Sequence, residues 1–231
     1  MNSPTNIHTN QSVLQQIADV LLMNGGFLSH PGLYSGETGL VLFFAKYARY
    51  VQDTLYHDYS YDLLSTIKSR IHRETPINYK RGLAGIGSAI EYLVQNGYFK
   101  ANTDKILADF DRRIFYTYNL PYLPQDDQMS VVYYAMWRLK GNSAKKDIIQ
   151  HTILPQLANQ YDFSALTGNK RPERMTERNF NTCLEQIAKN EFWNKDLGLQ
   201  DGLAGWGMSL LTELDDDDSW FSLFPDENRI S

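Results

Sequence analysis

Three acidic residues stand close to predicted helix starts and are the first candidates for chemistry: Glu37, Asp127 and Asp201. Two carboxyl groups held near each other can divide acid and base work, because one donates a proton while the other activates water or attacks the substrate. The same residue types also have a structural role at a helix start. Asp127 and Asp201 can cap helix N-termini, and Glu37 lies favourably in a first turn. Both interpretations are kept here.

Further polar residues near the same helix starts are predicted to line a binding groove: His30, Tyr34, Arg81 and Asp126. His30 precedes Pro31 and is interpreted as a loop histidine rather than as a ligand or a base. The other histidines share no spacing that suits a metal ion, and the single cysteine, Cys183, is interpreted as a small core residue. The sequence therefore predicts neither a metal site nor a cofactor.

A glycine motif marks the helices that must position these side chains. Gly-Leu-Ala-Gly-Ile-Gly at 82–87 recurs as Gly-Leu-Ala-Gly-Trp-Gly at 202–207, and each copy is followed by an apolar helical pattern. A third copy, Ser-Gly-Glu-Thr-Gly-Leu-Val at 35–41, has valine at the last glycine position. Repetition of this kind is typical of a repeat architecture. The structural glycines are Gly36, Gly39, Gly82, Gly85, Gly87, Gly202, Gly205 and Gly207.

Glycines three residues apart share one helix face, and this arrangement has two interpretations. Because they lack a side chain, a neighbouring helix or the entering chain can approach closely. That packing must offset the roughly 1 kcal/mol that each glycine costs relative to alanine inside a helix. In the functional interpretation, the inner helices present unpaired backbone N–H groups at one mouth, where carboxylates and phosphates would bind.

The apolar periodicity predicts helices along the chain and no strands. Broadly apolar helices that open with glycines alternate with amphipathic helices that carry one apolar stripe. A helix that is apolar on all sides belongs in an interior, and a one-stripe helix belongs on a surface. The step of 82 − 36 = 46 residues, taken again, reaches Asp127–Ser130 at the start of a further apolar helix, over 129–139. There Asp127 and Ser130 replace the glycines.

These patterns predict an all-α fold: an incomplete α/α toroid with about four inner helices, in a single domain over residues 1–231. Outside the glycine motifs we expect a helix at about 10–23, a cap at Asn102 or Thr103, and a helix that Pro155 divides. A less regular helix is expected around 173–190. Residues 215–231 form an acidic and aromatic tail, in which Asp215–Asp218 end the last helix and are solvated.

Charge and composition restrict the class of protein. Lysine and arginine total 22 against 27 aspartates and glutamates, so the net charge is −5 and no basic footprint for nucleic acid is expected. The apolar run Leu40–Ala45 is too short to cross a bilayer, and the start of the sequence lacks the pattern of a signal peptide. One cysteine permits no intrachain disulfide. We therefore expect a cytoplasmic protein without a membrane partner.

The glycine segments at 32–39, 82–87 and 201–207 resemble those of lanthionine synthetase C-like proteins, and the resemblance runs through residues 30–214. The resemblance implies an α/α toroid of inner and outer helices. Cyclase members of that family add cysteine thiols to dehydrated serine or threonine in a precursor peptide. They hold zinc with two cysteines and a histidine, one pair of which lies in a Cys-His-Gly motif.

This chain departs from that family in its length and in its metal ligands. Full members have seven helix pairs, and the chain has no Cys-His-Gly motif and a single cysteine. Because zinc activates the thiol, the cyclase reaction is not expected here. The resemblance then implies a protein that binds a peptide or assists the maturation of a ribosomally made peptide, with a precursor peptide or a maturation enzyme as partner.

An enzyme of another class is the alternative. Other α/α toroids are glycosidases, so Glu37, Asp127 and Asp201 would serve a carboxylate-dependent hydrolase that works in the groove. A separate expectation concerns assembly. Missing repeats leave apolar helix edges, which the tail segment Trp220–Phe224 is expected to cover; a homodimer formed through that segment is the alternative.

Overall fold

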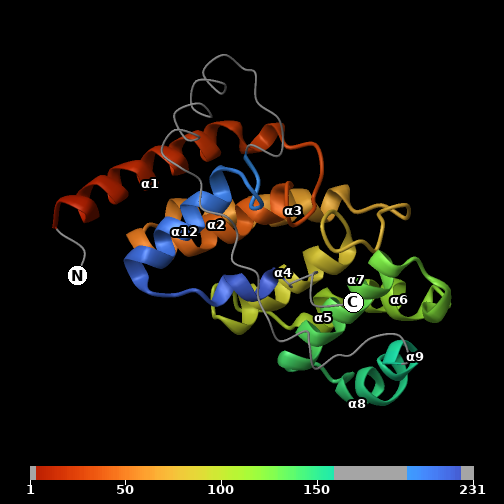
Figure 1. Ribbon diagram of the computed structural model, residues 1–231. Helices are drawn as coiled ribbons and strands as arrows, with labels where there is room; N and C mark the ends of the chain where they lie inside the picture. Colours follow the sequence, from red (N-terminus) through yellow and green to blue (C-terminus); the bar gives the residue numbers. More distant parts are fainter. Residues whose placement is uncertain (1–3, 159–196, 225–231) are drawn as a thin grey trace. The chain divides into compact units, whose positions relative to one another are not determined.

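A computed structural model describes residues 4–158 and 197–224, and every regular element in these ranges is a helix (Figure 1). The all-α prediction is confirmed. The described residues form two compact units. The first contains the chain up to Ile71 together with residues 197–219, and the second contains residues 72–158 together with 220–224. Each unit is described by itself. The predicted helix around 173–190 and Cys183 lie outside the described residues.

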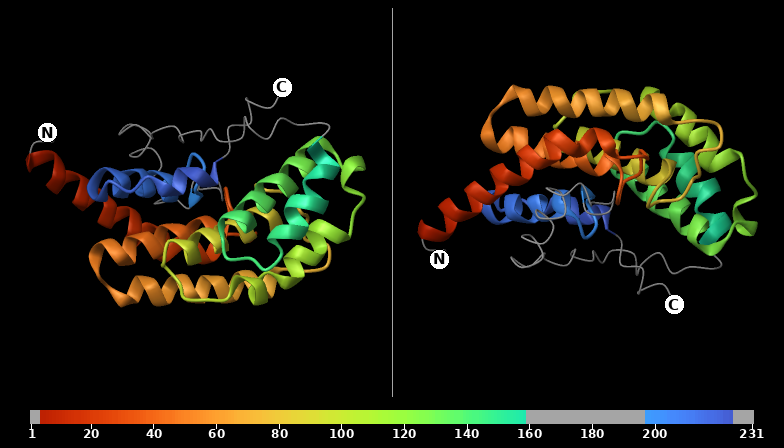
Figure 2. Two further views of the ribbon diagram at one scale, coloured as in Figure 1. Left: turned by 90° about the horizontal axis from the view of Figure 1, so that it is seen from below. Right: turned by 90° about the horizontal axis from the view of Figure 1, so that it is seen from above.

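The first unit is built from four helices: α1 (Pro4–Asn24), α2 (Glu37–Val51), α3 (Thr54–Arg70) and α12 (Leu203–Asp215). Figure 2 shows α2 and α3 side by side as a hairpin, and α12 packs against both α1 and α2 although it comes from the far end of the chain. The side chain of Asp53 caps α3 by accepting a hydrogen bond from the N–H of Leu55 at 2.9 Å.

The two predicted helix classes are present in this unit. Every residue of α2 from Glu37 to Ala48 is buried, as expected of an inner helix. In α3 only Tyr56, Ser60, Leu63 and Ile67 are buried, at the spacing of a single stripe. The hairpin therefore joins an inner helix to a surface helix.

The second unit contains a pair of inner helices, α4 (Leu83–Gln95) and α7 (Gln125–Lys140), which pack against each other. Asn102 caps a helix as predicted, since its side chain accepts from the N–H of Lys105 at 3.0 Å. The amphipathic segment after Asn102 divides into two helices. Pro155 begins a new short helix and so divides the last helical segment, as predicted. The shorter helices are α5 (Thr103–Ile106), α6 (Ala108–Tyr116), α8 (Lys146–Ile148) and α9 (Pro155–Ala158), with a π-helical turn at Ile149–Ile153.

The three glycine motifs share one backbone geometry. Each inner helix begins after an extended N-cap glycine: Gly36 (φ −122°, ψ −172°), Gly82 (φ −120°, ψ −161°) and Gly202 (φ −120°, ψ −175°). In each case the preceding loop folds back onto the helix start. A Cβ at Gly36, Gly82 or Gly205 would overlap the carbonyl oxygen of the residue six positions earlier: His30, Pro76 and Leu199. The motif therefore lets a loop lie directly on its own helix start.

The same loops take up the first N–H groups of two of these helices. In α2 the N–H groups of Glu37 and Thr38 donate to the carbonyls seven residues earlier, at 3.1 and 3.3 Å. In α4 those of Leu83 and Ala84 do the same, at 2.9 and 3.3 Å. In α12 the N–H of Gly205 donates to Gly198 O at 3.2 Å. The expectation of unpaired amides that bind an anion is therefore wrong for these donors.

The last glycine of the motif has a different neighbour from the first. A Cβ at Gly87 would lie 2.5 Å from the Tyr134 ring of α7, and a Cβ at Gly207 would overlap the Phe43 ring of α2. This position therefore brings two inner helices together, while the earlier glycines bring in the loop. Helix starts also meet within each unit: Leu199 N–H donates to Tyr34 O at 2.7 Å, and Tyr79 N–H donates to Ser130 Oγ at 2.9 Å.

Asp215–Asp218 were expected from the sequence to be solvated, but two of these carboxylates pair with a buried lysine. Lys46 of α2 is 2% exposed, and its Nζ lies 2.6 Å from Asp217 Oδ2 and 3.1 Å from Asp215 Oδ2. A buried ammonium group needs such partners, because an unpaired buried charge is strongly destabilising. Helix α12 ends at Asp215 with Asp216 in a left-handed C-cap conformation, and this turn carries Asp217 back to Lys46.

Because of this ion pair, the stability of the chain depends on pH in the acidic range. Burial alone would raise the pKa of Asp217, but hydrogen bonds from Lys46 and Ser219 and the charge of Lys46 lower it from 3.8 to about 2. A depressed carboxyl pKa stabilises the fold above the unfolded pKa, and this contribution is lost as the pH falls through 3.8 towards 2. Urea unfolding at a series of pH values should show a smaller acid-dependent loss for Asp217→Asn than for the wild type. Asp62→Asn, at an exposed carboxylate of α3, is the matched control; equal losses in all three proteins would contradict the assignment.

Candidate functional site

Glu37 is the predicted acidic residue with the most unusual surroundings. It is the first residue of α2, and the back-folded loop over it leaves the side chain 1% exposed. Its Oε1 lies 3.1 Å from Arg70 Nη1, and Arg70 also donates to Leu28 O at 2.5 Å. The second carboxyl oxygen, Oε2, is buried and has no hydrogen-bond partner among the described residues. One half of the carboxyl group is thus paired and the other half is not.

The electrostatics around Glu37 favour its neutral form. Burial raises the pKa of Glu37, and the charge of Arg70 opposes that shift without cancelling it. The pKa of Tyr59 is raised by its own burial and then by the charge of Glu37, which places that phenol in the same electrostatic environment. A carboxyl group with a raised pKa keeps its proton up to a higher pH than an ordinary carboxyl group does, and this suits a general acid.

The other two candidate acids lie elsewhere. Asp201 is exposed, with a left-handed backbone (φ 58°), and the N-cap of α12 is Gly202. Asp127 is the third residue of α7, whose N-cap is Pro124; burial and then the charge of Asp126 raise its pKa. The capping interpretation is therefore wrong for both residues. Glu37 and Asp201 belong to the first unit, and Asp127 belongs to the second.

The predicted groove residues also divide between the units. In the first unit, His30 Nδ1 accepts from Gly32 N–H and its Nε2 lies 3.3 Å from Ser35 Oγ, so this ring organises its own loop. Tyr34 is buried, and its carbonyl joins the loops before α2 and α12. In the second unit, Arg81 and Asp126 are both exposed near the starts of α4 and α7.

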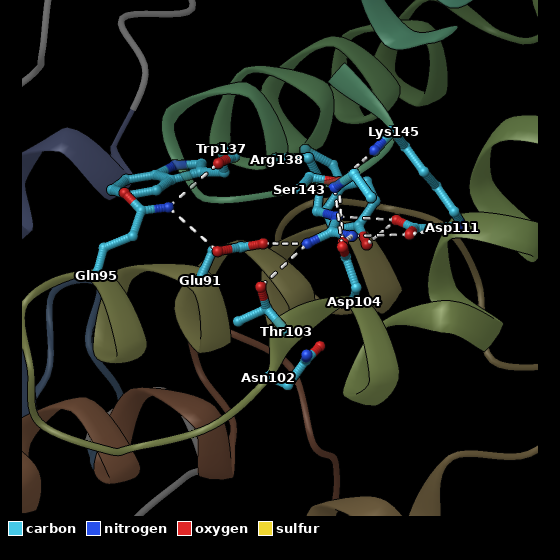
Figure 3. A network of polar contacts seen from close by, with 12 residues as sticks. Glu91, Gln95, Asn102, Thr103, Asp104, Asp111, Trp137, Arg138, Ser143 and Lys145 are labelled. Atoms are coloured by element: carbon cyan, nitrogen blue, oxygen red, sulfur yellow. Dashed lines mark hydrogen bonds and ion pairs between the residues drawn. The ribbon is translucent and has the colours of Figure 1, made fainter. Parts of the chain in front are cut away.

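A buried polar network in the second unit was missed by the sequence analysis (Figure 3). Arg138 of α7 is 0% exposed and contacts three carboxylates: Glu91 of α4, Asp104 of α5 and Asp111 of α6. Its Nη2 lies 3.0 Å from Asp111 Oδ2 and 2.5 Å from Asp104 Oδ1. Asp111 also accepts from Tyr134 Oη at 2.6 Å and from Lys145 Nζ at 3.0 Å. One guanidinium group thereby ties four helices together.

The sequence held a signal for this network. Arg138 and Glu91 are charged residues inside broadly apolar helical segments, and a charge in such a position must be paired when the helix is buried. What the sequence does not contain is the pairing itself, because Asp104 and Asp111 look like ordinary surface acids of an amphipathic segment. Arg138 has donors directed at all three carboxylates, so we interpret the network as structural rather than as a reactive site.

The described residues contain neither a metal-binding cluster nor a membrane-spanning helix. Within 4–158 and 197–224, no group of three or more histidine, cysteine, aspartate or glutamate side chains is arranged to hold a metal ion. No helix in that part of the chain has both the length and the apolar character needed to cross a bilayer. Glu37 Oε2, which has no partner among the described residues, keeps its capacity to form a hydrogen bond.

Comparison with known proteins adds no family assignment: no family model, curated protein or solved structure matches the chain.

Proposed function

We propose that this chain is a lanthionine synthetase C-like protein without the zinc site, which binds a peptide in the cytoplasm and assists the maturation of a ribosomally made peptide. The observation that carries the proposal is the common geometry of the three glycine motifs. Gly36, Gly82 and Gly202 cap their helices with nearly the same backbone angles, so the motifs on which the resemblance rests are also equivalent in structure.

The proposal extends to the architecture. Each unit contributes a pair of buried inner helices, α2 with α12 and α4 with α7, and α3 packs on the outside of the first pair. We propose that the two pairs belong to one incomplete α/α toroid. Trp220 and Leu223 of the tail are 0% exposed within the single chain, which favours a tail that covers its own chain over a dimer formed through it.

The residues of the sequence that could bind zinc support a peptide-binding role over cyclisation in this proposal. With one cysteine and no Cys-His-Gly motif, the chain lacks the residues that activate a thiol in the cyclase members. Selection of random peptides displayed on phage against the immobilised chain tests the role directly. Enriched sequences that bind the chain in solution with micromolar or better affinity are expected. Failure to enrich any sequence over a blank surface would contradict the proposal.

A second candidate function, a carboxylate-dependent hydrolase, is favoured by one observation: the raised pKa and unpaired Oε2 of Glu37. Glu37→Gln keeps the shape of the side chain and removes its proton chemistry. If Glu37 is a general acid, turnover of a panel of nitrophenyl glycosides should fall by about 100-fold or more while the thermal unfolding midpoint is retained. Asp62→Asn is the control. No turnover by the wild type, or equal turnover by Glu37→Gln, would exclude this role.

A further inference from the structure

The stretch from the end of α6 to the first turn of α7 presents aromatic rings to solvent. The exposed fractions are 53% for Tyr116, 45% for Tyr118 and 84% for Tyr122. An exposed tyrosine ring combines apolar area with a polar edge, which is why tyrosine is enriched at binding surfaces. Together with Asp126, these three tyrosines are called the Tyr122 surface below.

Hydrogen bonds hold the backbone on both sides of Tyr122, while the ring of Tyr122 is exposed to solvent. Gln128 is 4% exposed, and its Nε2 donates to Pro121 O at 3.1 Å and to Leu123 O at 2.8 Å. These are the carbonyls on the two sides of Tyr122. A ring fixed at its backbone and exposed at its tip loses little further freedom on binding, as expected of a preorganised anchor.

Asp126 is fixed in a similar way. Its carbonyl accepts from Ser130 Oγ at 2.7 Å, and Ser130 Oγ in turn accepts from Tyr79 N–H at 2.9 Å. The carboxylate itself is exposed in the first turn of α7. The backbone at Tyr122 and Asp126 is therefore held by hydrogen bonds to main-chain carbonyl groups, and the two side chains take no part in these bonds.

The segment that carries this surface has negative charge and no basic residue of its own. Between Arg113 and Arg138 the sequence contains no lysine, arginine or histidine, and its charged residues are Asp126 and Asp127. The ion pairs of the two flanking arginines, Arg113 with Asp109 and Arg138 with Glu91, Asp104 and Asp111, include neither Asp126 nor Asp127. Asp127 is partly buried, and burial, followed by the charge of Asp126, raises its pKa. Gln128 Oε1, also buried, has no donor in the same part of the chain. The Tyr122 surface thus offers hydrogen-bond acceptors and negative charge from its own segment of the chain.

We propose that the Tyr122 surface binds a cationic segment of the peptide, with an arginine or lysine side chain stacked on Tyr122 and paired with Asp126. The inference rests on the proposed function and gives it a peptide class. Aromatic rings attract such cations through their negative faces, and a nearby carboxylate completes the site. Because the ion pairs lie at an exposed surface, binding should weaken as the salt concentration rises.

Fluorescence polarisation with a labelled glycine-serine peptide that carries two arginines tests the inference, and the same peptide with citrulline in place of arginine is the matched probe. The arginine peptide should bind, and the citrulline peptide should bind at least about tenfold more weakly. Tyr122→Ser and the double variant Asp126→Asn with Asp127→Asn should each weaken binding by about tenfold or more. Tyr122→Phe keeps the ring and should bind as the wild type does, as should Asp62→Asn.

Two results would overturn the inference: equal binding of the arginine and citrulline peptides, or unchanged binding by the Tyr122→Ser and double aspartate variants. The phage selection separates this failure from that of the proposed function. If selected peptides bind but lack basic residues and are retained by Tyr122→Ser, peptide binding stands and this surface is wrong. If no peptide is selected at all, the proposed function itself fails.

Discussion

Replacement of Arg138 by leucine should lower the free energy of unfolding by about 3–5 kcal/mol. The guanidinium group is fully buried, and its removal leaves Glu91 (1% exposed) and Asp111 (0% exposed) as buried carboxylates without their main partner. Removing one member of a buried ion network is more destabilising than replacing the whole network, because the remaining charges keep their desolvation penalty. Urea unfolding followed by tryptophan fluorescence, to which Trp137 of α7 contributes, measures the change.

A rescue variant separates the charge effect from the loss of packing. Arg138→Leu combined with Glu91→Gln and Asp111→Asn removes the stranded charges and should recover part of the lost stability. Arg112→Leu, at an exposed arginine of α6 that pairs with Asp109, is the surface control and should change the free energy of unfolding by less than about 1 kcal/mol. If Arg138→Leu were as mild as that control, the network would not hold the unit together.

Replacement of Gly205 by alanine should destabilise the chain by about 2–3 kcal/mol even though alanine is the better helix former. The added Cβ would overlap the backbone carbonyl of Leu199, and a backbone atom cannot rotate away as the end of a side chain can. The loop must then move off the helix start and break the hydrogen bond from Gly205 N–H to Gly198 O. Thermal and urea unfolding of the purified variant measure the loss.

Gly26 supplies the matched control, since a Cβ added there would meet nothing within 4 Å. Gly26→Ala should be neutral or slightly stabilising, because alanine lowers the conformational entropy of the unfolded chain and its Cβ causes no clash in the folded state. Gly82→Ala, with its overlap on Pro76 O, should behave like Gly205→Ala. Similar stability of all three variants would mean that the motif glycines do not serve close approach of the loop.

The helical class and the two kinds of helix could be predicted because burial follows periodicity. The continuous apolar run from Leu40 to Phe44 marks a helix buried on all sides, and the stripe through Leu63 and Ile67 marks a surface helix. The loop that covers each helix start could not be predicted in the same way. It depends on hydrogen bonds between residues seven apart, such as Leu83 to Pro76, which leave no periodic trace in side-chain polarity.

The surroundings of the candidate site residues could be predicted only in part, for similar reasons. Glu37 could be selected because an acid in a glycine-rich helix start is unusual, but its burial and its pairing with Arg70 come from a loop and a helix that the sequence does not bring together. Lys46 and Arg138 were missed because a single charge in an apolar helix identifies no partner. Their partners, Asp217 and Asp111, lie 171 and 27 residues away along the chain.

At the starts of α2 and α4 the glycine motif lets the preceding loop accept hydrogen bonds from the first helical N–H groups, and amide hydrogen exchange measures whether these groups are covered. The N–H groups of Glu37, Thr38, Leu83 and Ala84 should exchange as slowly as amides inside α2 and α4, because loop carbonyls accept from all four. Exchange at the rate of an unstructured peptide would contradict the claim, since the first N–H groups of these helices would then be open to solvent.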